Sequence, residues 1–273
     1  MSRIPDVSQP IRAVAGWVPP LARFGYAAKG VVYLLVGGIA MRASGARGEE
    51  DLGGPSKALA SLADGSAGRA ALAVIAIGLM AHVLWRLVQA ALDPEHPEGG
   101  AKRLGIRVFY ILSAVIYASL AATAWQLWRG NRAGQDDGES HEIWVAKVLS
   151  QPFGAWLVMA AGIGVMAYGL HQLIKAAKGD VNRRMETPGG DTAQGLRLVG
   201  RLGTAARGLV LLPIGWFVMN AGRRYRAAEA ADTGEVLRML DNGPMLAAVG
   251  FGLAAYGLHQ VGKALFRRIE RPA

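Results

Sequence analysis

The sequence predicts an all-α, polytopic membrane protein with six transmembrane helices, arranged as three parallel two-helix repeats about a pseudo-threefold axis. Apolar residues make up 52% of the 273 residues and charged residues only 18%, and the mean hydropathy is +0.25. Soluble domains, by contrast, carry about 25% charged residues. The apolar residues are gathered into charge-free runs, and one two-span unit occurs three times along the chain.

Each apolar run, together with the basic side chains at its ends, is long enough to cross a bilayer as a helix. About 20 helical residues cross about 30 Å of hydrocarbon, and terminal Lys and Arg side chains can extend to the interface. A soluble helical bundle is disfavoured because these helices lack the polar face that a soluble surface needs. The predicted spans are 24–43, 70–91, 106–128, 152–174, 203–222 and 244–265.

The chain contains three copies of one hairpin, each beginning with an Arg-apolar-Gly sequence. Each copy crosses the membrane twice, so all three have the same orientation and are related by an axis along the membrane normal. The predicted divisions are an N-terminal segment, 1–20, and three transmembrane hairpin repeats, 21–92, 102–179 and 198–270.

A short amphipathic segment joins the two spans of each copy. The three segments align at a leucine, and they are 57–64, 144–151 and 235–242. We expect them to lie flat at the outer interface or to plug the outer end of the bundle.

The distribution of basic residues predicts the orientation. One side, which includes both termini, carries 19 Lys and Arg residues, and the other side carries 11. Basic loops stay in the cytoplasm, so both termini are predicted to be cytoplasmic. A nucleic-acid partner is disfavoured because the basic residues are spread over helix ends and form no known reading module.

Several motifs resemble those of a known family. They are RFGYAAKGVVYLLVGG at Arg23, QPFG at Gln151, and AYGLHQ at both Ala167 and Ala255. In these motifs the chain is similar to bacterial proteins of the domain-of-unknown-function family numbered 1206, over about 21–270. In the third copy, residues 241–244 depart from the QPFG pattern. The resemblance implies tandem two-helix units and a multi-pass protein of the bacterial inner (plasma) membrane, and it implies no particular activity.

The second span of each copy carries a polar stripe with i, i+4, i+7, i+11 spacing, which is one side of a helix. Polar groups inside a bilayer normally face protein or a water-filled path. The stripe therefore predicts a polar path lined by His82, Tyr168, His171, Lys175, Tyr256, His259 and Lys263. Imidazole titrates near neutral pH, so such a path could move protons or hold an anion. The alternative is hydrogen bonding between helices, which contributes about 0.6 kcal/mol per bond in membrane proteins.

A second group of basic residues lies at the predicted inner interface. Its members are Arg23, Lys29, Arg103, Arg201 and Arg207. They fit either of two roles: setting the topology, or binding anionic lipid headgroups or the phosphate of a solute.

Two functions remain open on the sequence. The first is a transport-like or channel-like membrane protein that passes a small solute, an anion or a proton. The second is a non-catalytic scaffold or accessory subunit that binds membrane lipids or a partner membrane protein. An enzyme, a metal site and a cofactor are not expected. The chain has no Cys, its predicted spans contain no Asp or Glu, and it shows no nucleophile elbow, phosphate loop or zinc motif.

Overall fold

The computed structural model describes most of the chain. The described residues are 17–45, 53–92, 101–131, 137–183, 185–186, 189–231, 233–240 and 243–268, with side chains described except at 18, 92, 101–103 and 137–141. Most of the predicted N-terminal segment 1–20 lies outside the described residues.

Six long helices confirm the predicted fold class. They are α2 (Val18–Gly45), α4 (Ser66–Leu92), α5 (Ala101–Trp128), α7 (Gly154–Lys178), α8 (Asp191–Arg224) and α10 (Gly243–Phe266), and all six are long and apolar enough to cross a membrane. Helix α8 begins well before the predicted span at 203, because a helix can continue past the hydrocarbon into the interface. Over the described ranges the only β-structure is a single bridge between Met185 and Arg267.

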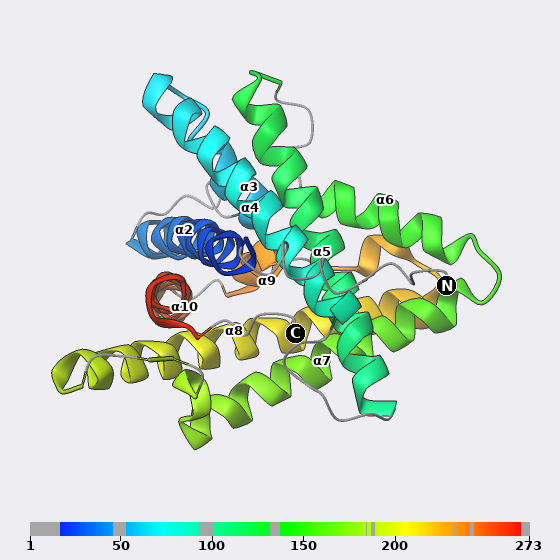
Figure 1. Cartoon of the computed structure of the whole chain (residues 1–273). Helices are drawn as coiled ribbons and strands as arrows, with labels where there is room; N and C mark the ends of the chain where they lie inside the picture. Colours follow the sequence, from blue (N-terminus) through cyan, green and yellow to red (C-terminus); the bar gives the residue numbers. More distant parts are fainter. Residues whose placement is uncertain are drawn as a thin grey trace, which may run out of the picture.

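The second helix of each repeat packs against the first helix of the next repeat. Helix α4 lies along α5, α7 along α8, and α10 along α2 (Figure 1). This cyclic pairing is the pseudo-threefold arrangement that three parallel hairpins predict. Small residues permit the close approach, as is usual between membrane helices. A Cβ atom added at Gly37 of α2 would overlap the backbone at Ala254 of α10, and one at Gly162 of α7 would overlap the backbone at Met219 of α8.

Packing within a repeat is less uniform. Helix α2 packs against α4, and α8 packs against α10. Helices α5 and α7, which form the second repeat, make at most marginal backbone contact across their described residues.

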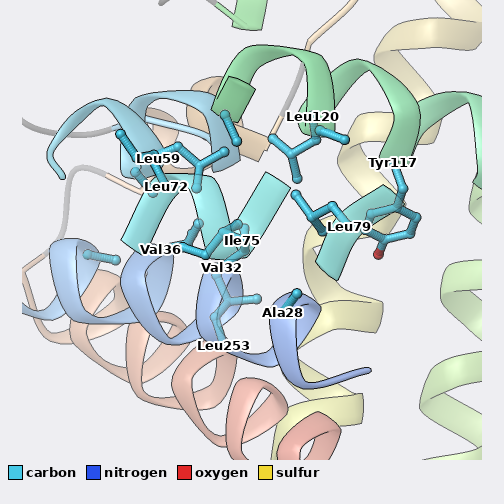
Figure 2. Close-up of a cluster of buried hydrophobic side chains, with 14 of the residues drawn as sticks. Ala28, Val32, Val36, Leu59, Leu72, Ile75, Leu79, Tyr117, Leu120 and Leu253 are labelled. Atoms are coloured by element: carbon cyan, nitrogen blue, oxygen red, sulfur yellow. The ribbon is translucent and has the colours of Figure 1, made fainter. Parts of the chain in front are cut away.

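One end of the bundle is closed by an apolar core, and we call it the plugged end. The core contains Val32, Val36, Leu72 and Leu253 from the long helices (Figure 2). Two short helices, α3 (Pro55–Ala60) and α9 (Thr233–Met239), add to this core through the buried side chains of Leu59 and Leu237. The prediction that the amphipathic segments plug one end is therefore confirmed for two of the three.

The third amphipathic segment behaves differently. Helix α6 (Asp137–Leu149) contacts both α3 and α9, but its Ile143 and Trp144 are exposed. It covers the plug from outside, as an amphipathic helix at an interface does.

Candidate functional site: a cationic cavity

A cavity of about 860 Å³ lies at the end of the bundle opposite the plug. All six long helices line it: α2 and α5 with residues near their beginnings, α4, α7 and α10 with residues near their ends, and α8 with residues nearer its middle. We call this the cavity end. Its volume falls within the range of about 300–1,000 Å³ that is usual for small-molecule sites.

The lining of the cavity is strongly basic. Asp180 is the one acidic side chain on the described lining. The basic lining residues are Lys29, Arg86, Lys175, Lys178, Arg183, Arg207, Lys263 and Arg267. A concave site of one charge sign with low-dielectric walls concentrates its field, so the electrostatic potential in the cavity is positive.

Arg207 is held by aromatic side chains. It donates hydrogen bonds to the hydroxyl oxygens of Tyr256 (2.6 Å) and Tyr168 (3.4 Å). Its guanidinium carbon also lies 4.9 Å from the ring centre of Tyr256 and 5.6 Å from that of Tyr33. Cation–π contacts of this kind stabilise a desolvated cation without neutralising it.

Lys29 is held in the same way. Its side chain is 2% exposed, and its Nζ lies 4.6 Å from the ring centre of Tyr117 and 5.8 Å from that of Tyr256. Lys29 and Arg207 stand at equivalent positions of the first and third repeats. Within the described part of the chain, neither forms an ion pair with a carboxylate.

The second repeat carries an apolar residue at that equivalent position. Phe109 lines the cavity there, and its ring centre lies 4.5 Å from that of Tyr168 on α7. The cavity is therefore aromatic on the side formed by α5, whereas each of the other long helices that line it contributes at least one basic residue.

Most of the predicted stripe lines the cavity. Six of its seven predicted residues are on the lining: Tyr168, His171, Lys175, Tyr256, His259 and Lys263. Sequence periodicity thus brings the stripes of the second and third repeats to one site.

The structure corrects the prediction for His82, which is fully buried outside the lining. Its ring packs edge-on against Tyr26 (5.5 Å) and Tyr117 (4.7 Å). The reason is the close approach of α2, where a Cβ atom on Gly25 would lie 2.7 Å from the Cα atom of His82. His82 is therefore buried in a helix–helix seam.

His259 joins the cavity to the segment that follows α7. Its Nε2 lies 2.9 Å from Oδ1 of Asn182, which belongs to the short helix η2 (Asp180–Asn182). The chain reverses into η2 at Gly179, where φ is +73° and α7 ends. Glycine suits this left-handed position because it has no Cβ atom.

The predicted interfacial basic residues have different surroundings. Lys29 and Arg207 line the cavity, whereas Arg23 is exposed outside it, and the side chain of Arg103 lies outside the described residues. Arg201 donates hydrogen bonds to the carbonyl oxygens of Ala176 (3.0 Å) and Ala177 (3.4 Å). It therefore caps the carboxyl end of α7, where a cation is favoured by the helix dipole.

Sequence reasoning did not assign several lining residues to the site. The sequence contained an indication for Arg86, because this residue occupies the position of Gln172 and Gln260 beside the stripe. Arg183 and Arg267 lie beyond the predicted spans, and only the fold brings them to the cavity. Across the described residues, no group of three or more His, Cys, Asp or Glu could hold a metal ion. The lining suits an anion.

Comparison with known proteins gives a family and one distant relative. The profile of the family described as Domain of Unknown Function (DUF1206) matches the chain in three segments, 24–93, 108–179 and 202–267. The chain is similar to an uncharacterised protein of Bacillus subtilis (strain 168) named YxxB, with 28% identity over 98% of this chain and 96% of that protein. No solved structure matches the chain significantly.

Proposed function

The chain belongs to the family described as Domain of Unknown Function (DUF1206), and from the charge of its cavity we propose that it is an anion-binding, transport-like protein of the bacterial inner membrane. The observation that carries the proposal is a cavity whose described lining holds eight basic residues and one acidic residue. By the distribution of basic residues, we further propose that the cavity and both termini face the cytoplasm.

The energetics of buried charge support a bound anion. Removing a cation from water costs several kcal/mol unless a partner compensates it. The tyrosine rings around Lys29 and Arg207 compensate only in part, and Nε of Arg207 has no hydrogen-bond partner within the described structure. A guanidinium matches phosphate and carboxylate oxygens in a two-point contact. An anion bound between these two side chains would complete the site.

The closed far end favours a carrier over an open channel. The cavity is at one end of the bundle, and the apolar core with α3 and α9 fills the other end. A solute that enters the cavity can leave on the other side of the membrane only after the plugged end opens, as in alternating access. In this proposal the stripe of α7 and α10 lines the solute site.

An apolar groove favours the alternative function, a scaffold or accessory subunit. The groove, about 790 Å³ in volume, lies between α2, α4 and α5 and includes Phe24, Met80 and Trp125. Such a surface suits a partner transmembrane helix or an acyl chain. The alternative explains this groove and leaves the charge of the cavity unexplained.

Phosphate binding tests the proposal. The detergent-purified protein is dialysed against radiolabelled inorganic phosphate, and Arg207→Gln is compared with Arg223→Gln, an exposed residue at the other end of α8. We expect Arg207→Gln to weaken phosphate binding about tenfold or more, because a hydrogen bond to a charged group contributes about 1.5–3 kcal/mol.

Two other outcomes decide against the proposal. Equal phosphate affinity of the two variants would remove the anion site. Phosphate binding without flux of any anion in proteoliposomes, either inorganic phosphate or a labelled anionic lipid, would leave the site and favour the scaffold over the carrier.

A further inference from the structure

The hairpin of the second repeat is open, whereas the hairpins of the first and third repeats are closed. Helices α2 and α4 pack together, as do α8 and α10, but the described backbones of α5 and α7 make at most marginal contact. The pseudo-threefold symmetry is therefore broken at one place.

Glycines show the difference residue by residue. In the closed repeats, Gly25 lies against the backbone at His82, and Gly203 lies against the backbone at Tyr256. The equivalent residue of the second repeat is Gly105, and a Cβ atom added there would meet no described atom within 4 Å. The sequence keeps the glycine of the closed hairpin, but no helix of the described structure lies against it.

The second helices show the same contrast. A Cβ atom on Gly78 would lie 2.5 Å from the Cβ atom of Ala28, and Gly252 contacts Ala206 in the same way. The equivalent glycine of α7, Gly164, again has open space around it among the described atoms. Both walls of the seam are therefore exposed in the second repeat.

Exposure of the apolar side chains shows the same contrast. Val32 of α2 and Val210 of α8 are 1% and 4% exposed, whereas the equivalent residue of α5, Leu112, is 52% exposed. On the second helices, Trp85 and His259 are fully buried, and the equivalent His171 is exposed.

The opening leads into the cationic cavity. Gly105 and Phe109 of α5 line the cavity on one side of the opening, and Tyr168 and His171 of α7 line it on the other. The contact between the rings of Phe109 and Tyr168 lies where the two helices approach each other. The seam between α5 and α7 therefore borders the cationic cavity.

We propose that the opening between α5 and α7 admits an anionic membrane lipid, whose headgroup phosphate binds in the cationic cavity while its acyl chains lie between the two helices. This rests on the proposed function and names the ligand class of that site. The headgroup and the acyl chains of such a lipid each match a different part of this region. The eight basic residues suit the anionic headgroup, and the apolar side chains of Val108 and Leu112, with Gly164 opposite, suit acyl chains.

Other ligands fit only one of these parts. A small soluble anion would use only the basic residues and leave the apolar faces of α5 and α7 to the surrounding bilayer. A neutral lipid would use the apolar faces and leave the cations Lys29 and Arg207 without an anion. An anionic lipid uses both.

Two matched tryptophan substitutions test the proposal. Gly164→Trp fills the opening, and Gly38→Trp places the same side chain on α2, where a Cβ atom also meets nothing described within 4 Å. Each variant is reconstituted in nanodiscs with phosphatidylglycerol that carries a photoactivatable acyl chain, and cross-links to α5 and α7 are mapped by mass spectrometry. Phosphate binding in detergent is measured in parallel.

We expect Gly164→Trp to reduce these cross-links at least about fivefold, and Gly38→Trp to leave them unchanged. Both variants should bind inorganic phosphate as the wild type does, since neither substitution touches the basic residues. Phosphatidylcholine with the same acyl chain should cross-link to α5 and α7 about fivefold less, since each cation near the headgroup contributes about 1 kcal/mol.

Three results would overturn the lipid proposal. The first is equal cross-linking in the two tryptophan variants, and the second is equal cross-linking of the two lipids. The third is the formation of disulfide-linked dimers by a Leu112→Cys variant, which would place a second copy of this chain in the opening. The chain has no native Cys, so such a dimer can only arise from the introduced residue. In each case, if phosphate binding still depends on Arg207, the anion site remains and only the lipid proposal fails. If phosphate binding does not depend on Arg207, the proposed function fails as well. If Gly164→Trp fails to fold, Leu112→Trp fills the opening from the other side.

Discussion

The two ends of the bundle use the same six helices for opposite purposes. At the plugged end, side chains such as Leu59, Leu237 and Leu253 are almost fully buried among apolar neighbours. At the cavity end, the same helices present basic residues, with Lys29 and Arg207 held against tyrosine rings. A buried charge without a counter-ion lowers the free energy of unfolding, whereas close packing raises it. Close packing and the proposed anion site are therefore located at different ends of the molecule.

The largest expected effect of a single substitution is at the plugged end. Leu253→Ala removes a side chain that is 1% exposed in the core (Figure 2), and we expect it to lower the free energy of unfolding by about 2–5 kcal/mol. The measurement is unfolding in detergent followed by circular dichroism. Leu258→Ala on the same helix is the control, because Leu258 is exposed. Equal loss in the two variants would contradict a packed core at this end.

At the cavity end, we expect a substitution to raise the free energy of unfolding. Lys29→Met replaces a buried cation without an ion-pair partner by an apolar side chain of similar length, so we expect the empty protein to gain about 1–4 kcal/mol of stability. Phosphate affinity should fall in the same variant. Added phosphate should therefore raise the melting temperature of the wild type more than that of the variant.

Arg223→Met serves as the control for Lys29→Met, because Arg223 is an exposed cation far from the cavity along α8. It should change neither the stability nor the phosphate affinity by a measurable amount. A loss of stability in Lys29→Met would show that the cation is stabilised in the empty protein and would remove the argument that an anion completes the site.

Sequence patterns predicted the helices and much of the lining for clear physical reasons. The bilayer requires long apolar runs, so all six spans could be read from composition. Polar groups avoid lipid, so helical periodicity identified Tyr256, His259 and Lys263 on the lining before any tertiary contact was known. Both inferences depend on the surroundings that the membrane imposes and need no knowledge of how the helices pack together.

Sequence patterns could not tell a cavity from a seam. His82 and His171 both belong to the repeated stripe, yet one is fully buried and the other is exposed. The difference depends on the first helix of the same repeat, because α2 packs against α4, whereas the described backbones of α5 and α7 make at most marginal contact. One local signal accompanies it, because Ala28 of the first repeat corresponds to the bulkier Val108 of the second. The distance between α5 and α7, however, follows from the packing of all three repeats.

The smallest expected effect concerns the hydrogen bond between His259 and Asn182 at the cavity end. In a double-mutant cycle with Asn182→Ala and His259→Phe, we expect a coupling energy of about 0.6 kcal/mol, the mean for polar pairs in a membrane protein. The measurement is again unfolding in detergent. A coupling energy near zero would show that water replaces the bond at no cost. A value above about 2 kcal/mol would mean that the bond is shielded from water, as in the seam around His82, and that this part of the cavity lining belongs with the packed half of the molecule.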